Sequence, residues 1–177
     1  MMKIRTLIAI TGIALMASVT GAQAEDPAKL NDLQIAHVAY TADNIDIRYA
    51  HLALAISTNP KIHAFARIMI RDHEAVNAQA LALLKKLGAN PQDNFLSKQL
   101  TANSHKLVDT MSKLRGKAFD KFYAKNELGY HKAVNNLVAN AFIPNIENNE
   151  VKSLFKAGLK IFKVHEGHAE MMVKGLN

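Results

Sequence analysis

The chain has 177 residues, a formal net charge of +7 and no cysteine. Without cysteine it can form neither disulfides nor thiolate metal sites, so histidine, carboxylate and methionine side chains are the remaining candidate ligands. No nucleophile elbow, phosphate-binding loop or dinucleotide fingerprint occurs in the sequence, which leaves hydrolase and kinase functions without support.

The first 24 residues are typical of a secretory signal peptide. Lys3 and Arg5 precede an apolar run over residues 7–19, and Ala22-Gln-Ala24 has the form of a cleavage site. The run is shorter than the roughly 20 residues that a transmembrane helix needs. We therefore expect cleavage after Ala24 and a periplasmic or secreted protein in which residues 25–177 form a single helical domain. Loss of the two basic residues lowers the formal charge from +7 to +5.

The next two segments predict an antiparallel pair of helices. Residues 30–57 and residues 60–87 carry apolar side chains at helical spacing. Between them, Thr58-Asn-Pro60 offers a stop, an N-cap and a proline suited to the first helical position. Gly88 ends the second helix. A turn this short places the two helices side by side.

Three further helices are predicted after this hairpin. Asn90 and Pro91 can start a shorter, less apolar helix, which Arg115-Gly116 interrupts. A fourth helix covers about residues 117–141, and a fifth begins after Asn148 or Asn149 and runs to about residue 174. Two hairpins joined by a connection of this length favour an all-α, ferritin-like four-helix bundle whose long crossover contains a short extra helix. An up-down-up-down bundle would need only short loops.

Ionisable residues interrupt the apolar faces of the long predicted helices. They are Asp46 on the first helix, His73 on the second, Glu127 and His131 on the fourth, and His165 and His168 on the fifth. The apolar line of the fifth helix is predicted to contain Leu154, Gly158, Ile161, His165, His168 and Met172. Buried polar groups are unfavourable without partners, and neutral imidazole is a favoured ligand of transition metals. The pattern therefore predicts a metal site between the helices.

Counting from the predicted turns indicates that these residues can meet. Asp46 precedes the first turn by twelve or thirteen residues and His73 follows it by fourteen or fifteen, a height difference of about 3 Å. Glu127 lies fourteen residues before the predicted end of its helix, and His165 lies fifteen after the start of the next one. His131 is one turn from Glu127. Both hairpins thus carry polar residues near mid-helix.

Each candidate has an alternative interpretation. Asp46 can be a solvated residue at the edge of its apolar stripe, and His73 can be a core histidine bonded to a neighbouring carboxylate. Glu127 and His131 can form a pair on the helix surface. His165 and the histidine one turn later, His168, can bind one metal or bridge two. For the whole set, a hydrogen-bonded polar layer without metal is the alternative.

Three segments carry a family resemblance. They are Ala64-Phe-Ala-Arg-Ile-Met-Ile-Arg-Asp72-His73, Phe119-Asp120-x-x-Tyr123 with His131 eight residues later, and His165. Over about residues 36–172 the chain resembles the secreted bacterial family catalogued as domain of unknown function 4142. The resemblance implies a ferritin-like helical bundle and an exported protein, and it implies no assigned reaction.

The wider ferritin-like group suggests how a metal would be bound. Its dinuclear sites use a glutamate from each of two helices and Glu-x-x-His from each of two others. This sequence has no Glu-x-x-His, although Asp46 and Glu127 could serve as the carboxylates while His73, His131 and His165 supply nitrogen. The departure towards histidine favours zinc or copper over ferroxidase or di-iron chemistry, with iron and manganese as alternatives.

The leading interpretation is therefore a periplasmic helical bundle that binds a transition metal, for metal binding, buffering or redox protection. The alternative is a non-enzymatic envelope-stress or interaction protein with a metal-free polar core layer. No catalytic role is favoured, and the enzymatic alternative is a metal-dependent oxidoreductase. Nucleic acid is not an expected partner, because aromatic residues do not interleave with the basic ones. A basic ridge on the fifth helix could contact an anionic envelope surface weakly, through Lys152, Lys156, Lys160 and Lys163.

Overall fold

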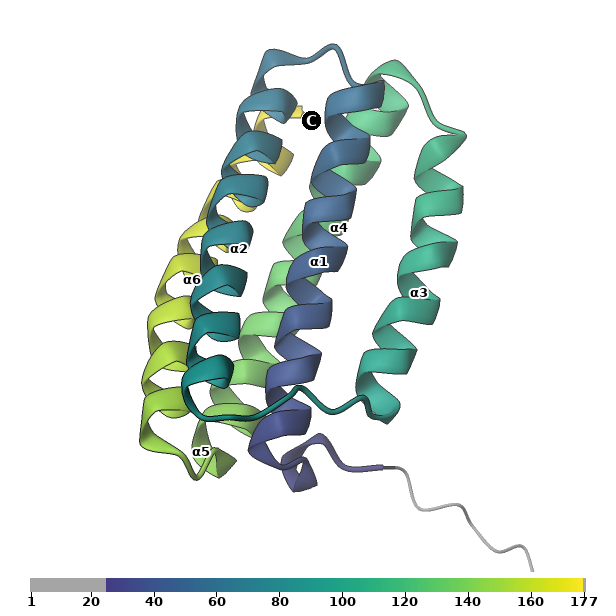
Figure 1. The fold of residues 1–177 in the computed structure, drawn as a ribbon. Helices are drawn as coiled ribbons and strands as arrows, with labels where there is room; N and C mark the ends of the chain where they lie inside the picture. Colours follow the sequence, from purple (N-terminus) through teal and green to yellow (C-terminus); the bar gives the residue numbers. More distant parts are fainter. Residues whose placement is uncertain (1–24, 177) are drawn as a thin grey trace, which may run out of the picture.

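The computed structural model describes residues 25–176, and the expected signal peptide lies outside this range. Within it, five long helices are packed as a bundle (Figure 1). They are α1 (Asp32–Ile56), α2 (Pro60–Lys86), α3 (Phe95–Ser112), α4 (Gly116–Leu137) and α6 (Asn149–Leu176). The prediction of an all-α fold is confirmed for these residues. No helix in residues 25–176 combines the length and the apolar character needed to cross a membrane.

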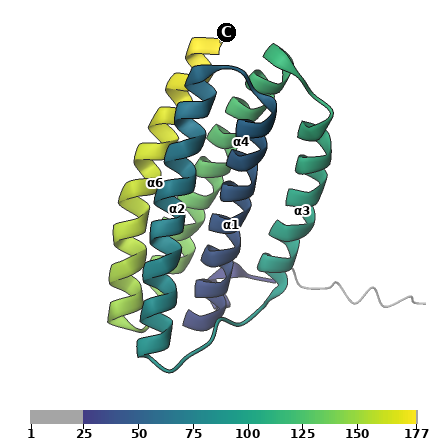
Figure 2. The same ribbon diagram turned by 45° about the horizontal axis from the view of Figure 1, so that its top comes forward.

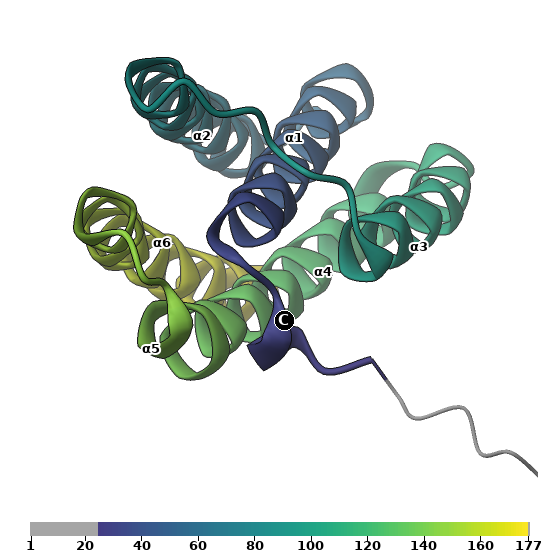
Figure 3. The same cartoon turned by 60° about the horizontal axis from the view of Figure 1, so that its bottom comes forward.

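Two antiparallel hairpins, α1 with α2 and α4 with α6, face each other along the bundle (Figures 1 and 2). Helix α3 lies outside them, mainly against α1 and beside α4 (Figure 3). It runs back along the bundle, so α4 starts at the same end as α2 (Figure 1). The connection holds an 18-residue helix, about 27 Å long, and not the short one expected from the sequence.

Asparagine side chains cap the first three long helices. Asn31 caps α1 in a reciprocal capping box with Gln34, and Asn59 caps α2 just before its proline. Helix α3 starts later than expected, because Asn94 and not Asn90 caps it through the amides of Leu96 and Ser97. Before this cap, the amide of Gln92 donates to the backbone oxygen of Leu33, which ties the connection to the start of α1.

The end of α4 widens into a π-helical turn, Val138–Phe142, followed by the single turn α5 (Ile143–Asn145). Pro144 lies in this segment and has no amide to donate to a helical hydrogen bond. The amide of Ile143 instead donates to the backbone oxygen of Val138, five residues earlier. The helical run therefore ends near the proline, a few residues after the expected end at about residue 141, and the chain turns towards α6.

The core has two apolar parts with a polar layer between them. One part surrounds Tyr49, Met69 and Phe119, and the other surrounds Ile35 and Phe142. Along each of α1, α4 and α6, the apolar side chains of the two parts are separated by buried ionisable residues. The polar layer therefore lies near the middle of the bundle.

The buried line of α6 differs from the predicted one. It contains Gly158, Phe162, His165, Ala169 and Met172, whereas Ile161 is exposed and His168 is half-buried. Both lines follow helical spacing, since steps of three and four residues can alternate in either order. Burial of the larger aromatic ring selects the observed phase, and this rotation moves His168 away from the bundle centre.

Candidate metal centre

Five predicted site residues converge in the polar layer, one or two from each of four helices. They are Asp46 on α1, His73 on α2, Glu127 and His131 on α4, and His165 on α6, all of them buried. The three histidines each offer a ligand atom within 4.8 Å of the others, and the same holds for the two carboxylates with His131. This cluster of histidine and carboxylate groups could hold a metal ion.

Carboxylates outside the cluster fix two of the imidazoles. Nδ1 of His73 donates to Oδ1 of Asp43 at 2.7 Å, and Nε2 of His165 donates to Oδ2 of Asp72 at 2.9 Å. Asp72 also accepts a hydrogen bond from Arg71, which holds the pKa of its carboxyl below the ordinary value. Metal-binding histidines in proteins usually donate their second nitrogen to such an acceptor.

A backbone oxygen fixes the third imidazole. Nδ1 of His131 lies 2.9 Å from the carbonyl oxygen of Glu127, one turn earlier on α4. A carbonyl oxygen can only accept, so this nitrogen carries the proton and Nε2 keeps its lone pair. All three rings therefore have one nitrogen bonded to oxygen and the other directed into the cluster.

The atoms directed into the cluster have no hydrogen-bond partner among the described residues. They are Nε2 of His73, Nε2 of His131, Nδ1 of His165, both carboxylate oxygens of Asp46 and Oε2 of Glu127. Buried polar atoms are rarely left without a partner, because each loses its contact with water. A metal ion bound between these atoms could satisfy them together.

Distances within the cluster suit the coordination of one ion. Oδ2 of Asp46 lies 2.7 Å from Nε2 of His73 and 3.3 Å from Nε2 of His131. The shorter contact lacks the alignment of a hydrogen bond. Two ligands of an ion with bonds of about 2.0–2.1 Å stand about 2.9–3.4 Å apart. Small side-chain movements would therefore bring these atoms to coordination distance.

The protonation states of the metal-free cluster follow from its burial. Burial and the neighbouring Asp46 carboxylate raise the pKa of Glu127 well above its ordinary value. Burial opposes ionisation of Asp46, but the charge of His73 and its close contact with this carboxylate outweigh burial and lower the pKa of Asp46. Burial likewise opposes protonation of His73, yet Asp46 and Asp43 raise its pKa to about 10. Without metal, a proton on His73 thus balances the carboxylates beside it.

His168, the sixth predicted residue, belongs neither to the group of three histidines nor to the group formed by Asp46, Glu127 and His131. It is half-buried in an open depression with Lys61, Phe65 and Met172, one turn beyond His165. Nδ1 of His131 is already bonded to a backbone oxygen, so the two groups share its one remaining nitrogen. The five clustered residues could therefore hold one ion between them.

Two supporting carboxylates were not predicted from the sequence. Asp43 lies three residues before Asp46, a spacing that places both on one helix face and could have been recognised. Asp72 was considered only as a neighbour of His73, but it bonds His165 on α6 instead. Adjacent residues of a helix point in different directions, which sends Asp72 and His73 to different partners.

Comparison with family models gives a match. A family model described as "Domain of unknown function (DUF4142)" matches residues 17–172, which include all five clustered residues. No curated protein and no solved structure matches the chain.

Proposed function

This chain belongs to the DUF4142 family, and we propose that it binds one transition-metal ion between α1, α2, α4 and α6. Its role would be metal binding, buffering or redox protection. The ligands would come from His73, His131 and His165, with Asp46 and Glu127 as the carboxylates. His168 is not included, because it lies outside the cluster.

One observation carries this proposal. Each of the three imidazoles is held by an oxygen acceptor on one nitrogen, and its other nitrogen has no hydrogen-bond partner among the described residues and faces a common centre. A structural polar layer needs its inner atoms paired with one another. In a metal site the same atoms are available to bind the ion, and acceptors outside the site hold the imidazole rings in place.

The donor set supports a divalent transition metal. Imidazole nitrogen suits zinc, copper, iron and nickel, and three histidines with a further open position are common in zinc sites. Two ionised carboxylates would balance the charge of a divalent ion inside the bundle. Zinc and copper remain the favoured ions, with iron and manganese as alternatives.

The proposal is tested by elemental analysis of protein purified without an affinity tag. We expect about one metal ion per chain, and we expect His131→Ala combined with His165→Ala to lose it. The matched control replaces two exposed histidines on α1 and α3, His51→Ala with His105→Ala, and should keep the metal. Metal-free wild-type protein whose melting temperature does not change on addition of zinc or copper would overturn the proposal.

The carboxylates on both sides of His73 support a second candidate function, an envelope-stress or interaction protein with a metal-free polar layer. In that state an imidazolium at His73 lies between Asp43 and Asp46. The two candidates differ in their response to zinc. Binding of zinc must displace the proton from Nε2 of His73, so metal uptake should release protons into a weakly buffered solution. A metal-free layer gives no such release.

The proposal extends to topology and location. The antiparallel hairpins and the return of the chain along α3 support a ferritin-like crossover. Residues 1–24 support export to the periplasm or beyond. Cell fractionation with N-terminal sequencing should find the protein outside the cytoplasm, beginning at Glu25. A cytoplasmic protein that keeps Met1 would contradict the expectation of export.

A further inference from the structure

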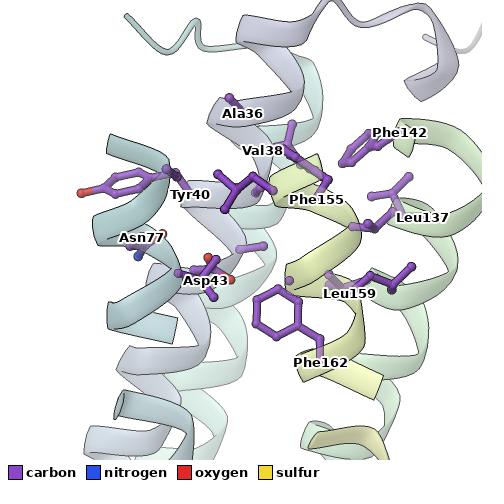
Figure 4. Close-up of a pocket in the computed structure, with 18 of the residues that line it drawn as sticks. Ala36, Val38, Tyr40, Asp43, Asn77, Leu137, Phe142, Phe155, Leu159 and Phe162 are labelled. Atoms are coloured by element: carbon purple, nitrogen blue, oxygen red, sulfur yellow. The ribbon is translucent and has the colours of Figure 1, made fainter. Parts of the chain in front are cut away.

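A cavity of about 160 Å³ lies between the helices, towards the end of the bundle where α2 finishes (Figure 4). Aliphatic and aromatic side chains from α1, α2, α4 and α6 form nearly all of its wall. In Figure 4, Asn77 and Asp43 lie on one side, and Phe142, Leu159 and Phe162 lie on the other. None of the predicted metal ligands lines it. The cavity is therefore a separate feature next to the candidate metal centre.

Asn77 supplies an unused hydrogen-bond acceptor in this apolar wall. Its side chain is buried, at 7% relative exposure, and Oδ1 has no hydrogen-bond partner among the described residues. Two other polar groups at the wall are already bonded. The hydroxyl of Tyr130 donates to the backbone oxygen of Ala42, and Oδ1 of Asp43 accepts from His73. A molecule in the cavity would thus meet a mostly apolar wall in which Oδ1 of Asn77 is a buried acceptor without a hydrogen-bond partner.

We propose that this cavity binds a small, mostly apolar molecule that donates one hydrogen bond to Oδ1 of Asn77, as a phenol or a small alcohol would. A cavity of about 150 Å³ lined by apolar side chains holds benzene, so a ligand of about six to eight non-hydrogen atoms fits. An anionic ligand is disfavoured, because no Lys, Arg or His side chain lines the wall to replace its hydration.

The position of the ligand gives it a link to the candidate metal centre. Phe162 lines the cavity and stacks on the imidazole of His73, with 4.6 Å between ring centroids. Asp43 also lines the cavity and accepts the Nδ1 proton of the same imidazole. A molecule in the cavity would therefore lie against two side chains that contact His73. Binding itself needs no metal.

Phenol and toluene test the proposal, because they match in size and differ in one hydroxyl. Both should bind the purified protein saturably in calorimetric titrations, with and without a chelator. In Asn77→Leu the hydroxyl of phenol loses its acceptor, and the ratio of the toluene to the phenol dissociation constant should fall by about 5- to 100-fold. An unchanged ratio, or no saturable binding of either compound to the wild type, would overturn the proposal.

Filling the cavity locates the binding. Ala39→Leu combined with Ala80→Leu adds side-chain volume at two wall positions and should abolish binding of both compounds. Ala64→Leu, at an exposed position of α2 outside the wall, should leave both affinities unchanged. Binding that survives in a folded double variant would show that the molecules bind elsewhere. Because metal stoichiometry is measured separately, failure here leaves the metal proposal standing.

Discussion

At the scale of single residues, the carboxylates that hold the imidazoles should control metal affinity. Asp43 and Asp72 lie outside the cluster but fix the rings of His73 and His165. Each change to asparagine keeps the size of the side chain and removes its charge, so zinc affinity should fall by about 10- to 100-fold. Competition with a chromophoric chelator measures this.

Asp109→Asn is the matched control for both changes, because Asp109 is exposed on α3. It should leave zinc affinity unchanged. If Asp43→Asn and Asp72→Asn also bound zinc as tightly as the wild type, the outer hydrogen bonds would not orient the ligands.

The pH dependence of the metal-free protein should reveal the buried imidazole of His165. Burial lowers its pKa to about 4, against about 6.5 in an unfolded chain. Between these values the unfolded chain binds a proton that the folded chain does not, so stability falls as the pH decreases from about 6.5 to 4. The loss should approach about 3 kcal/mol. Urea unfolding in the presence of a chelator measures it.

His165→Asn serves to isolate this contribution. Burial raises the pKa of Glu127 and of Asp43, and both groups titrate in either protein. The difference in unfolding free energy between wild type and variant should therefore rise with pH across the window from about 4 to 6.5 and then level off. A difference that stays flat across the window would mean that His165 is not buried as a neutral imidazole.

At the scale of helices, periodicity and capping residues predicted all the long helices, because their apolar stripes are long and their turns carry asparagine, proline or glycine. Single-helix reasoning failed on two points. It placed Ile161 on the buried line of α6 where the structure has Phe162, since the buried face depends on the helices that pack against α6. It also missed that Asp72 reaches α6, since contact between helices is not encoded in local spacing.

The turn between α1 and α2 is held by α4. Asp120 accepts hydrogen bonds from Oγ of Ser57 at 2.6 Å and from Nδ2 of Asn59 at 3.2 Å. Asp120→Ala would leave the buried hydroxyl of Ser57 without its acceptor and should destabilise the protein by about 2–4 kcal/mol. Urea unfolding measures this. The folded variant should still bind metal, because Asp120 belongs to neither ligand group.

Lys121→Ala is the control for the turn, since its side chain is exposed beside Asp120 on α4. It should change stability by less than about 0.5 kcal/mol. A similar small effect of Asp120→Ala would show that the hydrogen bonds to the turn contribute little.

At the scale of the molecule, the candidate centre brings together the two hairpins, α1 with α2 and α4 with α6. Mid-helix positions of the polar residues could be predicted by counting from each turn, and this was enough to bring five of the six together. The cavity could not be predicted, because its volume depends on how far apart the two hairpins lie. The distance between the hairpins is a property of the assembled bundle, so the sequence pattern of a single helix does not predict it.

Metal binding should stabilise the whole bundle, because the candidate ligands come from both hairpins. With free zinc about 1,000-fold above the dissociation constant, the folded state gains about 4 kcal/mol, which for a domain of this size raises the melting temperature by about 10 °C. Amide hydrogen exchange should slow in the middle of α1, α2, α4 and α6 together, because each would contribute a ligand. His131→Ala combined with His165→Ala should show neither effect. Protection confined to the α4–α6 hairpin would contradict a centre shared by both hairpins, since zinc would then bind without Asp46 and His73.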